Sequence, residues 1–333
     1  MISWASPANA HLCFELASFT LRGMTSPAPS SRLALLLLYL LVIAIWGTTW
    51  IAIRSAVDSV PPITASGLRF AIAFPILAAI VARSRAVPLR YPSGKGRLFA
   101  AVTVGYFALP FALMNLGGAA IPSGLSAVLF SMVSIFILAL SVPALGTRIS
   151  RRQATGVGAA LAALAALIAH QTGIGGHASP LGVLALLGAA AMHAVVYVTL
   201  KKQAGGMSPL TINTLPMGIA ALALCATGLL LEHPDAGAIT GESIAALVYL
   251  GAFASVAGFL AYFHLLRHLG PLPLALVFIL FPAVAQLAAV LGGERGMDGP
   301  SLALLALVLG FASTALSGGR RRTAPRLRPA LAR

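Results

Sequence analysis

The sequence predicts an all-α membrane protein with ten transmembrane helices, arranged as two inverted-topology repeats of five helices each. Composition is the first observation: of 333 residues, 59% are hydrophobic and 9% are charged, whereas a water-soluble protein of this size carries roughly 25% charged residues. The second is a series of long apolar runs, and the third is a set of residues that recurs in the same order in both halves of the chain. Together they indicate a helical bundle embedded in a lipid bilayer.

The individual helices follow from the length of the apolar runs, because a hydrocarbon core about 30 Å thick takes roughly 20 residues of helix. The sequence predicts spans at residues 33–53, 61–82, 97–118, 122–145, 152–170, 180–200, 209–231, 243–266, 271–292 and 300–317. A transmembrane β-barrel would instead show short segments of alternating polarity. Continuous apolar stretches such as residues 33–45 exclude that pattern.

The orientation of the bundle follows from its lysines and arginines, which favour cytoplasmic loops. With ten spans, 19 of the 22 basic residues fall on one side: Arg22, Arg32, Arg83, Arg85, Arg90, Lys95, Arg97, Arg148, Arg151, Arg152, Lys201, Lys202, Arg267 and the six arginines after residue 319. Only Arg54 and Arg295 fall on the other side, with six of the seven acidic residues. This asymmetry predicts a multi-pass protein of the inner membrane with both termini in the cytoplasm.

Five segments are expected along the chain. They are an N-terminal extension (1–30), a first five-helix repeat (31–170), a linker loop (171–179), a second five-helix repeat (180–317) and a basic cytoplasmic tail (318–333). Residues 1–23 form neither a span nor a targeting peptide, and Met24 stands shortly before Arg32 and the first span. Met1 and Met24 are therefore both candidates for the natural start.

The internal repeat is carried by residue pairs at nearly constant spacing. The pairs are Trp46 with His193, Trp50 with Tyr197, and Asn115 with His264. The first two pairs are 147 residues apart and the third is 149 residues apart. A repeat unit with an odd number of helices enters the membrane from the opposite side in its second copy. Inverted repeats of this kind are typical of secondary transporters, whose substrate site lies between the halves near the bilayer midplane.

The stretch WGTTWIAIRSAVDSVPPITASGLRF at residues 46–70 resembles the opening of an EamA domain of the drug/metabolite transporter superfamily. IPSGLSAVLF at 121–130 and FPAVAQLAAVLGGER at 281–295 stand where the family pattern has them. The resemblance covers residues 33–317 and implies two tandem EamA domains, with the fifth helix of each at the periphery. The first half departs from the pattern: it lacks a proline near Val133 and reads Gly146-Thr147-Arg148 in place of Gly-Glu-Arg.

Other classes of protein are disfavoured. The net charge of +15 comes from clusters between spans, which indicates membrane topology rather than nucleic-acid binding. Cys13 and Cys225 are too few for a disulfide framework or a metal site, and we expect no metal and no cofactor. The chain has no HExxH, P-loop or convincing nucleophile motif, which disfavours an intramembrane enzyme and direct ATP hydrolysis. A non-transporting scaffold would not require an inverted repeat.

Polar and aromatic residues within the spans are the candidates for a substrate cavity, which the resemblance locates between spans 1, 3 and 4 and spans 6, 8 and 9. They are Trp46, Thr49, Tyr106, Asn115, Ser131, Ser134, His193, Tyr197 and Gln286. For His193, near the middle of its span, lining the cavity and forming an interhelical hydrogen bond are both open. Trp50, close to the outer end of the first span, is assigned to the aromatic belt at the membrane surface.

Three further residues are assigned structural roles. Arg69 is the one full charge well inside a span, and we expect it to bond helix-end carbonyls or to extend toward the membrane surface. The alternative is that it attracts a substrate carboxylate, although the resembled family often has an arginine here whatever its substrate. Pro282 is expected to have a structural role in the ninth helix or to break it. Glu294 follows that helix too near the surface to act as a proton relay.

These observations indicate a secondary transporter that exports small organic solutes, such as amino acids or related metabolites, across the inner membrane by alternating access. No Asp or Glu falls inside spans 1 to 8, which favours facilitated diffusion over proton coupling through His193. A proton-coupled multidrug efflux transporter is the alternative. The expected partners are a small-molecule substrate and the lipid bilayer, with no nucleic acid; the identity of the substrate, the direction of transport and the oligomeric state are left open.

Overall fold

The computed structural model describes residues 32–84, 87–146, 149–172, 178–269, 271–294 and 296–317, and every regular element in these ranges is a helix. Eight of the described helices are long and apolar enough to cross a membrane, and two shorter apolar helical stretches cover Val277–Leu291 and Gly299–Thr314. The chain is therefore a multi-pass helical membrane protein. The extension 1–30 with the alternative start at Met24, the tail 318–333 and the centre of the linker 171–179 lie outside the described residues.

The helices begin and end close to the predicted spans. In chain order they are α2 (Arg32–Ser59), α3 (Pro62–Arg83), α4 (Gly96–Val102), η1 (Thr103–Ala108), α5 (Leu109–Ala120), α6 (Ser123–Ser131), α7 (Val133–Leu145), α8 (Arg151–Thr172), α9 (Pro180–Gln203), α10 (Pro209–Leu231), η2 (Ala236–Ala238), α11 (Gly241–Val248), η3 (Tyr249–Ala257), α12 (Gly258–His268), α13 (Pro271–Leu291) and α14 (Gly299–Ser317). One clear difference is in α2, which continues to Ser59 rather than residue 53. Within the added residues, Arg54 donates a hydrogen bond to the Ala119 carbonyl at 2.7 Å.

Two of the predicted spans contain a π-helical segment. In the third span η1 lies between α4 and α5, and in the eighth span η3 lies between α11 and α12. The two segments stand at corresponding positions of the two halves of the chain. A π-helical turn inserts an extra residue into a helix and is frequent at functional sites. The apolar pattern does not reveal it, because hydropathy is the same in an α- and a π-helical turn.

The fourth and ninth spans differ in continuity. α6 ends before Met132 and α7 begins directly after it, although no proline stands there. In contrast, α13 runs through Pro282 as one helix, so the helix break predicted at Pro282 is wrong. A proline removes one backbone hydrogen bond and bends a helix without having to end it. In a membrane bundle, groups on neighbouring helices can form hydrogen bonds with the backbone carbonyls that a proline leaves without a partner.

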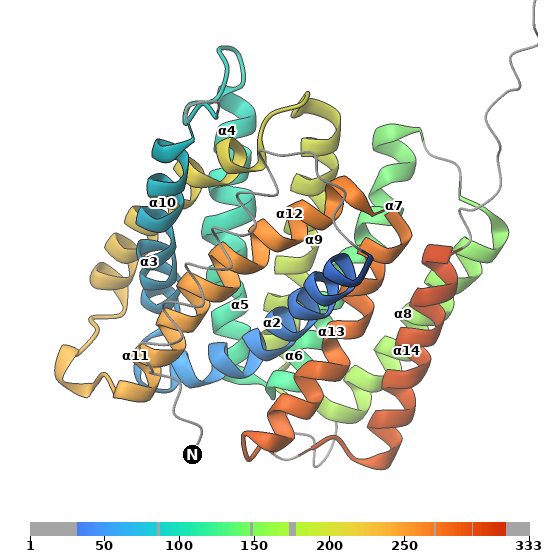
Figure 1. The fold of residues 1–333 in the computed structure, drawn as a ribbon. Coiled ribbons are helices and arrows are strands. Elements are labelled where there is room, and N and C mark those ends of the chain that lie inside the picture. Colours follow the sequence, from blue (N-terminus) through green and yellow to red (C-terminus); the bar gives the residue numbers. More distant parts are fainter. Residues whose placement is uncertain are drawn as a thin grey trace, which may run out of the picture.

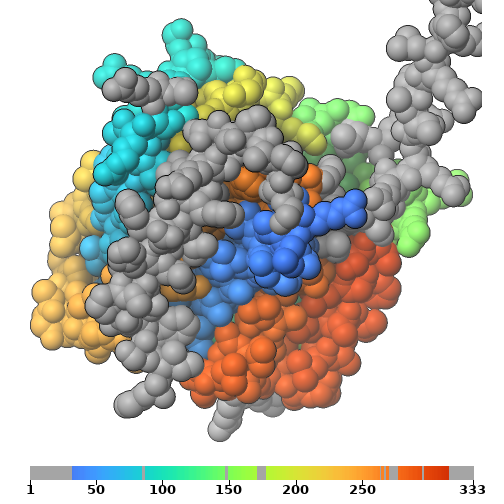
Figure 2. All heavy atoms as spheres, viewed as in Figure 1, coloured from blue at the N-terminus to red at the C-terminus, as the bar shows by residue number. Residues whose placement is uncertain are grey.

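The helices of the two halves are interleaved. In Figure 1, α2 crosses one face of the bundle, and it contacts α11, α12 and α13 of the second half. Figure 2 shows atoms of α2 (blue) directly against orange atoms of the C-terminal half on this face. α3 packs along α10 toward one edge of the bundle, and α8 packs along α14 at the opposite edge. The fifth helix of each predicted repeat, α8 or α14, is therefore peripheral.

Two carboxylates from the second half cap helices of the first half. Glu232, directly after α10, accepts hydrogen bonds from the backbone N–H groups of Ile63 and Thr64 at 2.9 and 2.8 Å. Glu294, shortly after α13, accepts one from the backbone N–H of Ser123 at 2.9 Å. These N–H groups open α3 and α6, where the free donors and the helix dipole favour a negative charge. The contacts tie the halves together and are consistent with the structural role predicted for Glu294.

Candidate substrate-binding cavity

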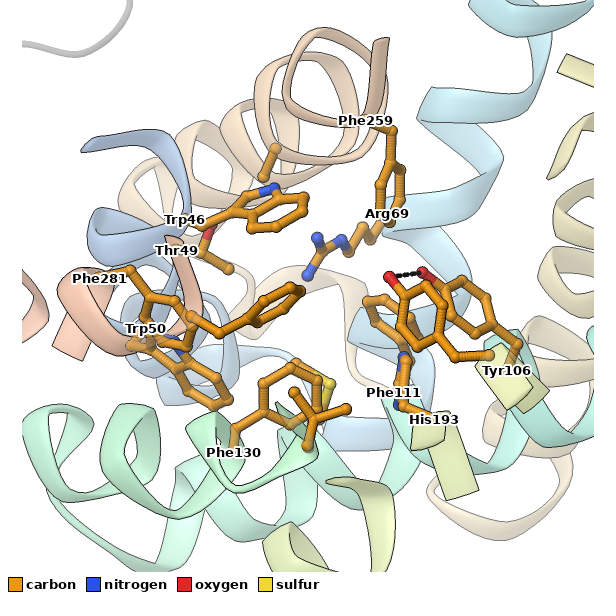
Figure 3. A pocket seen from close by; sticks show the side chains of 15 residues that line it. Trp46, Thr49, Trp50, Arg69, Tyr106, Phe111, Phe130, His193, Phe259 and Phe281 are labelled. Atoms are coloured by element: carbon orange, nitrogen blue, oxygen red, sulfur yellow. Dashed lines mark hydrogen bonds between the residues drawn. The ribbon is translucent and has the colours of Figure 1, made fainter. Parts of the chain in front are cut away.

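A cavity of about 60 Å³ lies between helices of both halves. Its lining is mostly aromatic and consists of Trp46, Thr49, Trp50, Arg69, Tyr106, Phe111, Met114, Phe130, Val133, His193, Tyr197, Ala254, Phe259, Phe278 and Phe281. These residues belong to α2, α3, η1, α5, α6 and α7 in the first half and to α9, η3, α12 and α13 in the second. Figure 3 shows the rings arranged around the Arg69 side chain. The walls are therefore the six spans named in the sequence analysis, with α3 in addition.

Two of the three residue pairs that match in the internal repeat meet at this cavity. Trp46 on α2 and its partner His193 on α9 both line it, and so do Trp50 and its partner Tyr197. Tyr106 links the second pair to the first, because its hydroxyl oxygen lies 3.1 Å from that of Tyr197 and its ring centroid lies 4.6 Å from that of His193. The repeat thus brings two corresponding positions from each half to one central space.

His193 is enclosed by aromatic rings. It is 3% exposed, and its ring centroid lies 5.6 Å from that of Phe111 and 5.2 Å from that of Phe130. Its Nδ1 bonds the Ala189 carbonyl oxygen one turn earlier in α9 at 2.9 Å. A carbonyl oxygen only accepts, so Nδ1 carries a proton. His193 therefore lines the cavity, and the hydrogen bond of its Nδ1 lies within its own helix rather than between helices.

Trp46 is held against the second half. Its ring centroid lies 4.9 Å from that of Tyr262 and 5.5 Å from that of Phe278. A Cβ atom on Gly258 would lie 2.8 Å from Trp46 Nε1, so glycine at this position allows the indole to lie against α12. On the same helix, the Thr49 hydroxyl donates to the Ile45 carbonyl at 2.8 Å. Both Trp46 and Thr49 line the cavity.

Trp50 corrects one prediction. It is 3% exposed and lines the cavity rather than the membrane surface. Its ring is nearly parallel to that of Phe281, at 6.4 Å between centroids, and lies 5.4 Å from that of Phe130. The predicted span ended at residue 53, which put Trp50 close to the membrane surface. Because α2 continues to Ser59, Trp50 lies deeper, and its assignment to an interfacial belt is wrong.

Arg69 projects into the cavity from α3 (Figure 3). It is 4% exposed, and its Nε donates a hydrogen bond to Ser255 Oγ at 2.8 Å. Its Cζ lies 4.8 Å from the ring centroid of Phe111, within the range of a cation–π contact. The structural role expected for Arg69 requires either a bond to a helix-end carbonyl or extension to the membrane surface. The buried side chain does not reach the surface, and its Nε bonds a serine hydroxyl instead of a carbonyl.

Asn115 is a predicted cavity residue that lies elsewhere. It is 2% exposed, and its Nδ2 donates to Ser66 Oγ at 2.7 Å and to the Pro62 carbonyl at 3.2 Å. It therefore joins α5 to the beginning of α3. An amide in a membrane span has the same apolar sequence context whether it faces a cavity or a neighbouring helix, so hydropathy does not separate the two.

Three other predicted polar residues are also absent from the lining of this cavity: Ser131, Ser134 and Gln286. The Ser131 hydroxyl donates to the Val128 carbonyl at 2.7 Å within the same stretch of chain. Ser134 is buried, 6% exposed, near the start of α7. The Gln286 amide packs against Gly124, leaving no space for a Cβ atom there, so it joins α13 to α6. Gln286 therefore packs between two helices, whereas Ser131 bonds within its own.

Phenylalanines form much of the lining, and none of them is among the cavity residues predicted from the sequence. They are Phe111, Phe130, Phe259, Phe278 and Phe281. In a chain that is 59% hydrophobic, a phenylalanine in a span is not distinguishable by type from one that faces lipid or a neighbouring helix. The spacing of Phe278 and Phe281 by three residues, which puts both on one face of α13, is the one available signal.

The chemistry of the cavity is that of a binding site for an amphipathic molecule. No acidic side chain is among its lining residues, and no group of three or more His, Cys, Asp or Glu within the described ranges could hold a metal ion. The polar groups are the Tyr106 and Tyr197 hydroxyls, the His193 imidazole and the Arg69 guanidinium. A few polar groups among aromatic walls are typical of small-molecule sites.

Two segments of the chain, residues 33–169 and 180–318, match the family described as the EamA-like transporter family. The chain belongs to the EamA-like transporter family. The two tandem matches confirm the resemblance to EamA domains that the sequence motifs indicate. Membership identifies this multi-pass membrane protein as a transporter.

Several EamA relatives cover most of the chain. It is 35% identical to Protein PagO of Salmonella typhimurium over 84% of this chain and 92% of that protein. It is 30% identical to a probable amino-acid metabolite efflux pump of the same species, over 86% of this chain and 96% of the pump. A solved crystal structure of a protein 22% identical in sequence matches with a TM-score of 0.61, over 86% of this chain and 97% of the other. At that identity, the structural likeness establishes the fold alone.

Proposed function

We propose that this protein is a secondary transporter that exports small organic solutes, amino acids or related metabolites, across the inner membrane by alternating access. One observation carries the proposal: the cavity is lined by two pairs of corresponding residues, Trp46 with His193 and Trp50 with Tyr197, one member from each half. A site shared by two repeats is accessible from either side when one repeat rocks against the other.

The proposal includes ten transmembrane helices in two inverted repeats, residues 31–170 and 180–317, with both termini in the cytoplasm. The uneven distribution of Lys and Arg supports this orientation. The matching positions of η1 and η3 support the repeat. So do the peripheral positions of α8 and α14, which pack on each other. In this topology Glu232 and Glu294 cap their helices at the outer surface.

The name of one relative supports amino acids or related metabolites as the solute class, because that relative is called a probable amino-acid metabolite efflux pump. The mostly aromatic lining suits a solute with an apolar body. Alternating access requires the rings that line this space to separate on one side at a time, so that a solute can enter from either face of the membrane.

Facilitated diffusion is the proposed mode of transport, because no carboxylate lines the cavity in the described part of the chain. Proton-coupled antiport of drugs through His193 is the alternative, and the position of His193 on the cavity wall is the observation in its favour. A role as an intramembrane enzyme or as a scaffold has no comparable support, since family membership indicates transport.

The experiment is uptake by the purified full-length protein in proteoliposomes, using a panel of labelled amino acids, organic acids and hydrophobic cationic drugs, each with and without a pH gradient. We expect at least one amino acid or related metabolite to be transported without a gradient. Transport of the cationic drugs alone, and only with a gradient, would support the multidrug alternative. No transport of any compound, by protein that a thermal unfolding transition shows to be folded, would contradict the proposal.

A further inference from the structure

Arg69 is a buried cation with one edge unused. Nε is bonded to Ser255 Oγ at 2.8 Å, but Nη1 is buried and has no hydrogen-bond partner among the described residues. In Figure 3 the guanidinium points into the space between Trp46 on one side and Tyr106 and Phe111 on the other. A guanidinium offers five N–H donors in a fixed planar fork, so this geometry leaves donors directed at the cavity.

No acidic residue neutralises this charge within the described part of the chain. The one ion pair found there joins His170 and Asp298, while Glu232 and Glu294 bond backbone N–H groups at helix ends. An unpaired charge away from water is costly unless another group compensates it. The Phe111 face compensates in part through its cation–π contact at 4.8 Å. The part of the Arg69 charge that no other group compensates favours the binding of an anion in the cavity.

The orientation of the guanidinium is built into the fold. Ser255 lies in the π-helical segment η3, which packs on α3. Gly251 permits this contact, because a Cβ atom there would lie 2.8 Å from the Arg69 carbonyl oxygen and 2.7 Å from the Ile72 side chain. Ser255 accepts the hydrogen bond from Nε, so the Nη groups at the other edge of the guanidinium face the cavity. A purely structural tie between α3 and η3 would not require the unused donors.

The charge of the lining disfavours cations. No carboxylate is present among the lining residues to pair with an ammonium group, and Arg69 repels positive charge. The aromatic rings favour an apolar body, and the hydroxyls of Tyr106 and Tyr197, 3.1 Å apart, offer neutral polar contacts. The site therefore combines one anion-binding group with a hydrophobic enclosure.

We propose that Arg69 binds the carboxylate of the solute, with Ser255 as a positioning residue, and that the cavity takes organic monocarboxylates with an apolar or aromatic body and excludes cations. This inference rests on the proposed function, since it names the class of solute for the same cavity. It assigns a binding role to Arg69, for which the sequence analysis preferred a structural one. A guanidinium forms two parallel hydrogen bonds with a carboxylate, which a neutral amide does not reproduce.

The test measures binding directly, with three probes that share one body and differ at the head: 3-phenylpropionate (anion), 3-phenylpropanamide (neutral) and 3-phenylpropylamine (cation). Quenching of tryptophan fluorescence reports binding, because Trp46 and Trp50 both line the cavity. We expect the wild-type protein to bind the acid about ten- to a hundredfold more tightly than the amide, the range of a charge-assisted hydrogen bond, and to bind the amine most weakly. Equal binding of acid and amide by the wild type overturns the inference without any variant.

Variants then assign the effect to Arg69. In Arg69→Gln the acid and the amide should bind alike, Arg69→Lys should keep part of the preference, and Ser255→Ala should weaken binding of the acid while binding of the amide is unchanged. Arg54→Gln, which removes an arginine outside the cavity, is the matched control and should keep the full preference. A preference for the acid that persists in Arg69→Gln overturns the inference.

The outcomes separate this inference from the proposed function. Acid binding that depends on Arg69, combined with no transport in proteoliposomes, would support the site and contradict the transport mechanism. If Arg69→Gln leaves transport of amino acids unchanged, and the amine 3-phenylpropylamine is transported equally well, the proposed function would be supported and the role of Arg69 contradicted.

Discussion

At the scale of single residues, transport should depend on the rings that both halves contribute to the cavity. Trp46→Ala and Tyr106→Ala each remove an aromatic contact worth roughly 0.5–1.5 kcal/mol beyond burial, or about a two- to twelvefold loss of solute affinity. We expect the half-saturation concentration for uptake in proteoliposomes to rise by that factor, with the protein still folded. Ser313→Ala is the control, because its hydroxyl bonds the Leu309 carbonyl within α14, away from the cavity. Equal effects of the two sets of variants would show that the cavity is assigned wrongly.

Gly258 gives a second prediction at this scale. A Cβ atom there would lie 2.8 Å from Trp46 Nε1 and 3.3 Å from the Ile45 side chain, and the rigid indole has little freedom to withdraw. Gly258→Ala should therefore displace Trp46 into the cavity, which a change in tryptophan emission and weaker solute binding would report. Gly310→Ala is the matched control, since no neighbouring helix among the described residues lies within 4 Å of its Cβ position. Unchanged emission and binding in Gly258→Ala would contradict the described packing.

Residue identity revealed only part of the cavity. Trp46 and His193 are recognisable because each is a polar aromatic at matching positions of a repeat, in the middle of an apolar span. Arg69 is conspicuous in the sequence, but its role depends on Ser255, which lies in a different half of the chain. Asn115 was misplaced, since a single polar residue carries no information about which neighbour it faces.

At the scale of helices, a polar contact between His170 and Asp298 lies at one end of the packed pair α8 and α14. Asp298 precedes α14, accepts a hydrogen bond from the backbone N–H of Ser301 at 3.0 Å and lies 2.7 Å from His170 Nε2. Hydrogen bonds from Ser301 and His170 lower the pKa of the Asp298 carboxyl to about 2. The lowered pKa means that this carboxylate stabilises the folded state most fully above its ordinary pKa, near 4.

We therefore expect Asp298→Ala to lower the midpoint of thermal unfolding in detergent near neutral pH. The contribution of Asp298 should disappear as the pH falls from about 4 toward 2, because the carboxylate becomes protonated in the folded protein. Circular dichroism melts of wild type and variant across this range provide the measurement. A difference in midpoint that grows as the pH falls through this range would show that the sign is wrong.

The sequence predicted the helices well and their irregularities poorly. Apolar runs specify where a helix lies in the membrane, since length and hydropathy are what the bilayer requires. The π-helical segments η1 and η3 and the interruption at Met132 depend on how neighbouring helices pack. Pro282 is the reverse case: a proline suggests an interruption, but α13 continues through it.

At the scale of the whole molecule, the topology makes a prediction about sidedness. Four exposed positions are suitable for single cysteines in a background that lacks Cys13 and Cys225: Pro88, Ser150, Gln203 and Asp235. The first three should be protected from a membrane-impermeant thiol reagent added to intact cells, whereas Asp235→Cys should be labelled. Labelling of the first three from outside, with protection of Asp235→Cys, would invert the proposed orientation.

The measurement that tests facilitated transport through the cavity most directly is counterflow in proteoliposomes at equal pH on both sides. Vesicles loaded with an unlabelled solute identified in the uptake panel are diluted into trace labelled solute. Wild type and His193→Gln should both accumulate label transiently, because exchange down the solute gradient needs no proton relay, and the transient should weaken in Trp46→Ala. Absence of counterflow at equal pH, with accumulation that requires an imposed pH gradient and is lost in His193→Gln, would contradict uniport and establish coupling through the histidine.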